Sequence, residues 1–355
     1  MAIDYNPLFE EVDKATLDTF RKQEKSTETV AMTFVIMIVV ALFGFFFVVS
    51  AISSEATGGA RPERIALIVA IALTLAAAAF FVYRIIARAG ALRRYRLTKF
   101  AVRNGMLYST TATPPRFQGA IFNVGNARAV YERLWSDTDP AVELGNYRYT
   151  TGSGKNKTTH HWSYLALRLP RRLPHMLLDA KGNNSLFGSN LPIRFGRDQR
   201  LSLEGDFDEH FTLYCPREYE ADALYVFTPD LMALLIDEAA NLDVEIMDDW
   251  MLVYAKSKLD FSDPHRLSRL LGIVDTVGKK TRSRSARYAD DRILHSAKTA
   301  EGERVAGAPL GAARLSHNLI APNGRRLKSG TPWLIFSFVA VAMIAWFFIR
   351  ILAGV

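Results

Sequence analysis

The chain has 355 residues, of which 49% are hydrophobic and 23% are charged, and its formal net charge is +8. Its one cysteine, Cys215, excludes an intrachain disulfide and a zinc site built from several cysteines. The charge surplus is local, because residues 276–332 carry 12 Lys and Arg against 4 Asp and Glu, a difference of 8 that equals the net charge of the whole chain.

Residues 1–29 are predicted to form a cytoplasmic N-terminal amphipathic helix, with the helix itself over residues 7–27. Asn6 suits the N-cap and Pro7 suits the first helical position. A helix of this kind can lie on a membrane surface or against a folded domain, and both alternatives remain open. The side chains that fall near one face are Phe9, Val12, Thr16 and Phe20.

Three apolar runs dominate the hydropathy of the chain. Residues 30–53 and 65–83 contain no charged residue, and residues 333–355 contain only Arg350. A helix needs ~20 apolar residues to cross the hydrocarbon core of a bilayer. The sequence therefore predicts an α-helical membrane anchor of three transmembrane helices, at residues 30–53, 65–86 and 333–355.

Basic residues beside these runs predict the orientation of the protein. One group follows the second run without an intervening acid, and another precedes the third run. We expect a multi-pass protein of the plasma membrane, with the N-terminus and the main domain in the cytoplasm and the C-terminus outside. The residues predicted to contact the membrane surface are Arg88, Arg93, Arg94, Arg96, Lys99, Arg325, Arg326 and Lys328.

Residues 279–332 form a basic segment without a sustained apolar period, and we predict that it is largely irregular. Basic residues close to a bilayer are attracted to anionic lipid headgroups by ~1 kcal/mol each. Binding to nucleic acid would need aromatic residues among the basic ones, and Tyr288 is the only aromatic residue of the segment. The expected partners are anionic membrane lipids, with a membrane or cytoplasmic protein as an alternative, and no nucleic acid.

Residues 97–278 are predicted to form a cytoplasmic α+β domain dominated by antiparallel β-hairpins. Asn104-Gly105 lies between runs of period-two apolar residues, which favours a hairpin turn there. A second hairpin with a longer tip is predicted over residues 143–169, because both of its strands show the same alternation.

The second half of this domain mixes short strands with helices. Thr228 and Pro229 suit the start of a helix that ends near Ala239, and Asp248-Asp249 suits a tight turn between two strands. A last amphipathic helix is predicted over residues 264–277. The other short strands are predicted at residues 175–180, 199–205, 210–216 and 223–227.

Residues 202–239 resemble a widespread, uncharacterised group of bacterial membrane-anchored proteins that is catalogued as a domain of unknown function. The likeness is best over residues 200–255, and helix-capping and core residues carry it, so it implies a fold and no chemistry. Residues 95–105, which follow paired helices, give a weaker likeness to bacterial pleckstrin-homology-like membrane proteins. The residues that match the first group are Phe207, Phe211, Tyr214, Thr228, Pro229, Met232, Leu234 and Leu235.

The glycine-rich stretch 151–159 does not have the spacing of a phosphate-binding loop. Tyr149 stands where that motif needs a glycine, and Asn156 stands where it needs Ser or Thr. We interpret the stretch as a flexible hairpin tip. The adjacent His160 and His161 face opposite sides of a strand and therefore do not chelate one ion together.

His210 with Asp206 and Asp208 is a candidate metal site, because an Asp-x-Asp pair can converge in a loop. Acids that precede a strand also form turns and caps, and on this ground we predict no metal and no cofactor. The chain has no recognisable catalytic motif. Cys215 precedes a proline in a strand-like run, which is an unpromising setting for a nucleophile. We predict no catalytic residue.

The sequence thus predicts a non-enzymatic, membrane-tethered interaction or scaffold domain at the inner face of the plasma membrane. One alternative is a sensor domain for a lipid headgroup or a small molecule. A second alternative is a membrane-bound hydrolase with a dispersed active site that includes His210 and its neighbouring acids.

Overall fold

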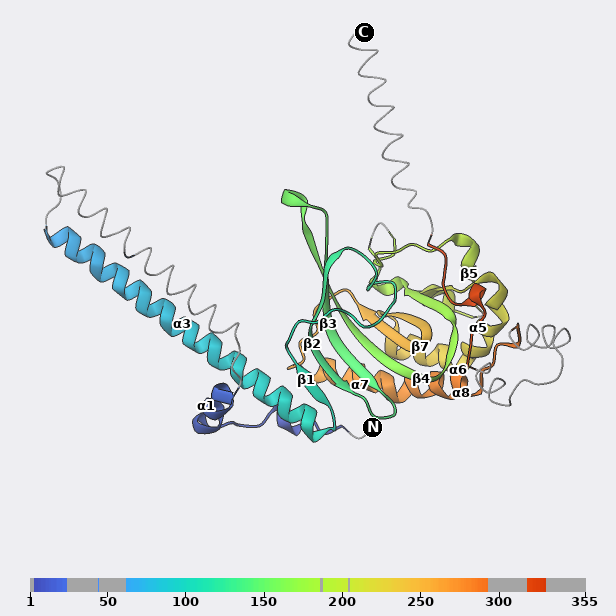
Figure 1. Cartoon of the computed structure of the whole chain (residues 1–355), viewed down its shortest axis with the longest axis horizontal. Coiled ribbons are helices and arrows are strands. Elements are labelled where there is room, and N and C mark those ends of the chain that lie inside the picture. Colours follow the sequence, from blue (N-terminus) through green and yellow to red (C-terminus); the bar gives the residue numbers. More distant parts are fainter. Residues whose placement is uncertain are drawn as a thin grey trace, which may run out of the picture. The chain divides into compact units, whose positions relative to one another are not determined.

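Figure 1 shows the computed structural model of the chain, which describes residues 3–23, 44, 62–185, 188–203, 205–292 and 318–329. These residues form two compact units. The first unit comprises residues 3–104, and the second begins at Gly105. The candidate site lies entirely in the second unit.

The first unit contains the 3-10 turn η1 (Asn6–Leu8) and the helices α1 (Lys14–Gln23) and α3 (Pro62–Arg103). Near the end of α3, Lys99 Nζ lies 2.6 Å from Glu10 Oε1. Arg96 donates from Nε and Nη2 to the carbonyl oxygen of Glu10, at 3.0 and 2.7 Å. These contacts hold the residues before α1 against the last turns of α3.

The end of α3 lies where the sequence predicts a hairpin. Asn104 Nδ2 donates to the carbonyl oxygen of Phe100 at 2.8 Å, and Gly105 adopts a φ of 66°. A left-handed glycine commonly ends a helix, and the same Asn-Gly pair also serves in hairpin turns. The hairpin predicted at Asn104-Gly105 is therefore wrong, because the pair ends a helix.

Among the described residues, no helix has both the length and the apolar character that crossing a membrane requires. This finding contradicts the predicted anchor of three transmembrane helices, and with it the multi-pass localisation in the plasma membrane. Of the predicted spans, residues 30–53, apart from Gly44, and residues 333–355 lie outside the described residues. Residues 65–86 belong to α3, a helix of 42 residues that continues without a break into a basic stretch. An uncharged run can thus be one part of a longer, mixed helix.

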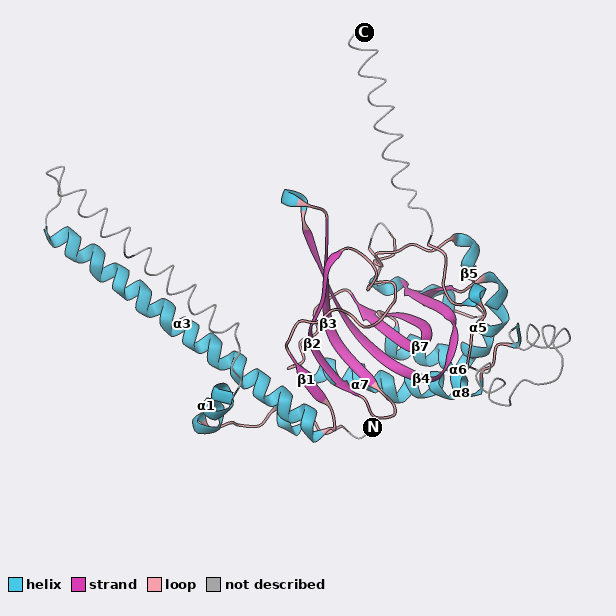
Figure 2. Cartoon of the chain, in the orientation of Figure 1, coloured by secondary structure: helices cyan, strands magenta, loops and turns pink. Residues whose placement is uncertain are grey.

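The second unit is α+β, and its seven strands form one antiparallel sheet (Figure 2). Strands β1, β2, β3, β4, β6 and β5 follow one another in this order, and β7 pairs with β4. The strands are β1 (Leu107–Ser109), β2 (Asn126–Ser136), β3 (Val142–Thr151), β4 (Thr158–Ala180), β5 (Arg200–Leu201), β6 (Phe211–Tyr214) and β7 (Asp243–Ala255).

Strand β4 has 23 residues and pairs with three other strands. Its first ten residues pair with β3 and its last four with β6. Strand β7 pairs with the opposite edge of β4 from Ser163 to Leu178. The β4–β7 register shifts within residues 168–176, a stretch that contains Pro170 and Pro174. Proline has no N–H to donate, so it is tolerated in a sheet at such irregular positions.

Opposite this stretch, β7 contains an irregularity in place of the predicted turn. Asp248 pairs with Leu173 and adopts a φ of 55°, whereas Trp250 pairs with Arg168. One continuous strand therefore passes through Asp248 and Asp249, and the tight turn predicted there is wrong. A bulge needs the same left-handed backbone that a turn does, which explains why the two look alike in sequence.

Helices lie along β4 on one face of the sheet. Helix α7 (Pro264–Ile273), the π-helical turn η6 (Val274–Gly278) and helix α8 (Lys279–Arg287) follow one another there (Figure 2). A Cβ atom on Gly278 would lie 2.5 Å from Leu167 Cδ2, so a larger residue at this position would displace the Leu167 side chain. The segment expected to be largely irregular from residue 279 onward thus begins with a helix.

Three further helices flank β6 in the chain: α4 precedes it, and α5 and α6 follow it. Helix α6 confirms the helix predicted from the Thr228-Pro229 signal, whereas residues 223–226, expected in a strand, are helical. Apolar residues without charge between them suit either element, and here packing decides. The helices are α4 (Phe207–His210), α5 (Glu220–Val226) and α6 (Pro229–Ala239); the 3-10 turns are η2 (Gly154–Asn156), η3 (Lys181–Asn183), η4 (Arg197–Gln199), η5 (Arg217–Tyr219) and η7 (Pro322–Gly324).

An aromatic core fills the other face of the sheet. Phe122, from the loop before β2, packs edge-on against Tyr147 and Tyr164, with ring centroids 4.9 and 5.2 Å apart. Phe117 contacts Trp250 in the same way at 4.9 Å. Edge-to-face pairs of this kind add ~0.5–1.5 kcal/mol each to the burial of apolar area. The loop is therefore a fixed part of the domain.

Candidate functional site

The β3–β4 hairpin has one buried and one exposed side. Tyr147 and Trp162 face each other across the ladder and are buried in the aromatic core. Arg148 and His161 form the next facing pair, and both are exposed. Because successive side chains of a strand point to opposite faces, this pair lies on the face that also carries the helices, at the end of the hairpin.

Four side chains meet on this exposed side, and we call them the Tyr131 patch: Tyr131, Arg148, His161 and Lys258. The Arg148 guanidinium lies 5.6 Å from the Tyr131 ring centroid, and Lys258 Nζ lies 5.3 Å from it. Tyr131 Oη is 3.5 Å from His161 Nδ1, with the two rings perpendicular. One phenol ring is thus in contact with two cations and an imidazole.

Buried polar bonds hold Lys258 in this position. Asn146 on β3 is fully buried, and its side chain binds the backbone of Leu259 in both directions. Nδ2 donates to the Leu259 carbonyl oxygen at 2.9 Å, and Oδ1 accepts from its N–H at 2.8 Å. Glu132 points inward, where it accepts from Tyr108 Oη at 2.7 Å and from Asn146 Nδ2 at 3.2 Å. The patch is therefore preorganised by the core.

The electrostatics of the patch are cationic. Burial raises the pKa of Tyr131 to about 12, and the Glu132 charge contributes to the rise, so the phenol stays neutral and able to donate. Burial lowers the pKa of His161, and the charges of Lys258 and Arg148 lower it further. Within the described part of the chain, neither Arg148 nor Lys258 forms an ion pair.

The surrounding hairpin adds positive charge and supplies no acid. Residues 144–178 contain six Lys and Arg and no Asp or Glu. Lys155 and Lys157 are exposed at the tip, in and beside η2. His160 lies on the opposite side from His161, stacked on Tyr149 at 4.8 Å, which confirms that the two histidines face apart.

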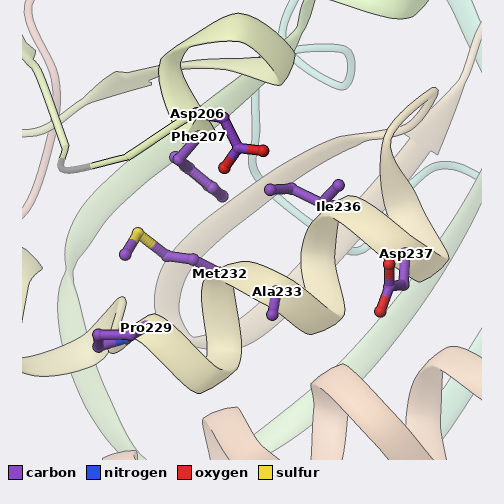
Figure 3. Close-up of a pocket in the computed structure, with 7 residues that line it drawn as sticks. All are labelled: Asp206, Phe207, Pro229, Met232, Ala233, Ile236 and Asp237. Carbon is purple, nitrogen blue, oxygen red and sulfur yellow. The ribbon is translucent and has the colours of Figure 1, made fainter.

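A first pocket lies between α4 and α6 and has a volume of about 360 Å³. Phe207, Met232 and Ile236 point toward one another in it, with Asp206 beside them and Asp237 farther along α6 (Figure 3). Five of its seven lining residues are apolar, among them Phe207 and Met232. Among the described lining residues, the only polar side chains are the carboxylates of Asp206 and Asp237.

A second pocket, of about 540 Å³, is formed by the loop before β2 and the first residues of that strand. Both arginines that line it are bonded to the protein. Arg116 Nη2 lies 2.7 Å from the buried Glu143 Oε2, and Arg128 Nη1 donates to the Phe122 carbonyl oxygen at 3.1 Å. In this respect the pocket differs from the Tyr131 patch, where the cations have no acidic partner in the described chain.

A buried array of His175, Glu245 and Tyr254 resembles a catalytic group but is fully engaged. His175 Nε2 lies 2.6 Å from Glu245 Oε1, and its Nδ1 accepts from the Leu327 N–H at 2.9 Å. Glu245 Oε2 accepts from Tyr254 Oη at 2.7 Å and from the Ala120 N–H at 2.8 Å. The array is at most 3% exposed and lines neither pocket, so its role is to join residue 327 to the sheet.

The three metal-ligand candidates from the sequence do not share hydrogen-bond partners within the described residues. Asp206 precedes α4 and lines the first pocket, and His210 ends α4. Asp208 accepts from Ser202 Oγ and from the Leu203 N–H, as a turn-forming acid does. In the described ranges, no three His, Cys, Asp or Glu side chains form a metal-binding group. Cys215 is buried, and burial raises the pKa of its thiol to about 12.

The basic residues predicted to contact a membrane surface are partly engaged within the protein. Arg96 and Lys99 bind Glu10 in the first unit. In the second unit, Arg325 Nε donates to the Ile320 carbonyl oxygen at 2.8 Å, and Arg326 pairs with Asp248 at 2.9 Å. The backbone of Lys328 bonds to Gln199. The other predicted residues, Arg88, Arg93 and Arg94, lie on α3.

Of the four residues of the Tyr131 patch, the sequence singled out only His161, which was weighed together with His160 as a metal ligand and set aside. Tyr131, Arg148 and Lys258 were missed because they come from β2, β3 and the segment after β7. One signal was available: the hairpin sequence lacks acids over residues 144–178 while its exposed positions carry basic residues. That signal gives the charge of the surface and not the position of Tyr131 or Lys258.

Comparison with known proteins gives little further information. No family model matches the chain. No curated protein matches it either. Among solved structures, the crystal structure of the mycobacterial trehalose monomycolate transport factor A, TtfA, is similar over 50% of this chain and 90% of that chain, with 13% sequence identity and a TM-score of 0.32. This degree of similarity carries no argument about fold or function.

Proposed function

We propose that the second unit is a non-enzymatic interaction domain that binds an extended acidic segment of a partner protein along the β3–β4 hairpin. The observation that carries the proposal is the contact of two cations, Arg148 and Lys258, with one neutral tyrosine ring, without an acid paired to either in the described chain. An arriving carboxylate would relieve the repulsion between these cations and gain charge-assisted hydrogen bonds.

The patch offers several donors to one anion. Arg148 presents a fork of N–H groups, Lys258 an ammonium, and Tyr131 a hydroxyl. A hydrogen bond to a charged group contributes about 1.5–3 kcal/mol where it is shielded, but an exposed ion pair contributes only about 0.2–1 kcal/mol. The patch is exposed, so binding through charge alone would be weak and sensitive to salt. A partner needs further contacts beside it.

The edge of β4 next to the patch provides such contacts. Arg168 N–H donates to the Ala141 carbonyl oxygen at 2.9 Å, and the β3–β4 register continues from there to Thr158 without a shift. Alternate residues of a strand direct their backbone groups to opposite sides. Thr159 and His161 therefore direct their N–H and C=O groups away from β3.

No strand of the described chain occupies that edge. The β4–β7 ladder ends at Ser163 and Ala255, and the chain then turns aside to Leu259, which Asn146 holds. Thr159 and His161 are exposed. An extended peptide can add to such an edge, where backbone bonds supply affinity and alternate side chains supply specificity. Acidic side chains at alternate positions would then meet the patch.

Lysines at a strand edge can also serve only to prevent pairing with other chains. The lysines can prevent pairing only with a strand that they repel, and they attract an acidic strand. The patch moreover contains no Ser, Thr or Cys and no carboxylate, and its positive charge favours the binding of an anion over catalysis.

The test uses the full chain and a fluorescein-labelled octapeptide of alternating Glu and Val, with anisotropy as the measurement. We expect saturable binding that weakens with added salt and is lost in the Arg148→Glu/Lys258→Glu variant. The matched control is Arg269→Glu/Lys279→Glu, which makes the same change in net charge at exposed positions. Equal weakening in both double variants would refute the site.

Strand addition is tested separately with Thr159→Pro, which removes an N–H that the hairpin itself does not use, against Thr159→Val. A peptide N-methylated on one edge serves the same purpose with the wild-type protein. We expect about tenfold weaker binding for the proline variant and for the methylated peptide, equivalent to about 1.4 kcal/mol. If both bind normally, the partner is held by charge alone.

A further inference from the structure

Two buried carboxylates face each other where β4 and β7 end. Leu178 and Val244 are the last paired residues of this ladder, so Asp179 and Asp243 occupy the next facing positions. Asp179 is 5% exposed and Asp243 is fully buried. Like charges directly opposite in a sheet are destabilising, and burial strengthens their repulsion.

Unpaired oxygen atoms are concentrated around this pair. Of seven buried side-chain polar atoms without a hydrogen-bond partner in the described chain, four belong to this group, and all four are oxygens. An unpaired buried acceptor loses its hydration without compensation. The four atoms are Asp179 Oδ1, Asp243 Oδ2, Asn183 Oδ1 and Asn190 Oδ1.

In the side chains of Asn183 and Asn190 the amide nitrogen donates, and the oxygen Oδ1 has no hydrogen-bond partner in the described chain. Asn183 Nδ2 donates to the Asn241 carbonyl oxygen at 3.2 Å, and Asn190 Nδ2 donates to the Asn183 carbonyl oxygen at 3.3 Å. Hydrogen bonding from the Asn183 and Asn190 side chains lowers the pKa of Asp243, whereas its Oδ2 has no partner of ordinary hydrogen-bond geometry in the described chain. The other oxygen, Oδ1, accepts from the Ala180 N–H at 2.9 Å.

The charge on this group is not balanced within the described chain. Burial raises the pKa of Asp243 to about 7 against the opposing effect of its hydrogen bonds, and the neighbouring charge of Asp179 raises it further. Burial also raises the pKa of Asp179, against hydrogen bonding from the Ser189 and Asn184 side chains, which lowers it. No basic side chain of the described residues is among the causes that shift the pKa of either carboxylate.

We propose that Asp179, Asp243, Asn183 and Asn190 form a binding site for a hard divalent cation, with calcium as the first candidate. Calcium binds carboxylate and amide oxygens and takes 6–8 of them at 2.3–2.6 Å. A charge of +2 would balance the two aspartates and satisfy the unpaired oxygens together. A single buried water donates only two hydrogen bonds and leaves the two charges facing each other.

The site would join three parts of the second unit. Asp179 belongs to β4, Asp243 begins β7, and Asn183 and Asn190 come from η3 and the chain that follows it. It lies at the opposite end of the β4–β7 ladder from the Tyr131 patch and is independent of the proposed function. It also differs from the group of Asp206, Asp208 and His210.

The test measures thermal unfolding of the full chain after removal of divalent ions with EGTA and EDTA, with CaCl₂, MgCl₂ or NaCl added back. We expect calcium to raise Tm saturably, by about 5 °C at one hundred times its Kd. Asp243→Asn should abolish the calcium effect without lowering Tm in the absence of calcium, because it removes one of two repelling charges. Asp206→Asn is the matched control and should keep the effect.

A second readout is the calcium content of the protein after gel filtration, measured by atomic emission, which does not depend on stability. One equivalent in the wild type and in Asp206→Asn, and none in Asp243→Asn or Asp179→Asn, would support the site. The proposal is overturned if neither divalent ion changes Tm, if Asp206→Asn removes the effect, or if Asp243→Asn still binds one equivalent.

Discussion

Replacing His175 by phenylalanine is the most direct test of how residue 327 is joined to the sheet of the second unit. His175 is 3% exposed, and both of its ring nitrogens are engaged, with Glu245 Oε1 at 2.6 Å and with the Leu327 N–H at 2.9 Å. Loss of the short bond to the carboxylate costs about 1.5–3 kcal/mol, and the unpaired Leu327 N–H costs about 1–3 kcal/mol. The free energy of unfolding should fall by roughly 2.5–6 kcal/mol in total.

Urea unfolding measures this loss, and amide hydrogen exchange locates it. We expect exchange to accelerate over residues 318–329 before the rest of the sheet, because Leu327 is the point that His175 holds. His160→Phe is the control: His160 is partly exposed and has one bond, to Thr151 Oγ1 at 2.8 Å, so its loss should cost about 0.5–1.5 kcal/mol. The reasoning fails if His175→Phe costs no more than the control, or if exchange of residues 318–329 is unchanged.

Three further outcomes are expected. The affinity of the acidic octapeptide should increase as pH falls below 6.5, because the pKa of His161 is lowered and its imidazole gains a positive charge only below that pH. This pH dependence should disappear in the His161→Gln variant. Gly125→Ala should destabilise the protein by about 2–5 kcal/mol in urea unfolding, since φ is +69° and a Cβ atom would lie 2.5 Å from the Thr150 carbonyl oxygen. Gly154 also has a positive φ, but a Cβ atom there would have free space, so Gly154→Ala should cost only about 1–2 kcal/mol. Cys215 should resist a thiol reagent at pH 8 until the protein unfolds, because it is buried and burial raises its pKa to about 12; rapid labelling of the native protein would contradict this.

Local sequence predicted those elements in which period and turn chemistry agree. The β3–β4 hairpin is an example, because alternation on both strands left one register that buries Tyr147 and Trp162 together. The signals failed where one residue type serves two structures. Asn104-Gly105 ends a helix, and Asp248 forms a bulge, yet both positions need the left-handed backbone that a turn needs.

The candidate sites depend on contacts that no local pattern contains. Lys258 reaches Tyr131 only because the buried Asn146, 113 residues before Leu259, binds the backbone there. Asp179 and Asp243 face each other only because β4 and β7 pair, with β5, β6 and three helices between them in the chain. The uncharged run at residues 65–83 shows the opposite case, in which a strong local signal did not identify the structure, a single helix of 42 residues.

The bond between His175 and Leu327 joins residues 152 positions apart in the sequence. Contacts of such long range form late, because the chain must close a large loop before they add any stability. During synthesis from the N-terminus, β4 and β7 are complete long before residue 327 exists. Until then, His175 Nδ1 in the nascent sheet lacks the N–H of Leu327 as its hydrogen-bond donor. We therefore expect the folding of this domain to finish only after residues 318–329 have been synthesised, and chains truncated before Asn318 to reach a looser sheet.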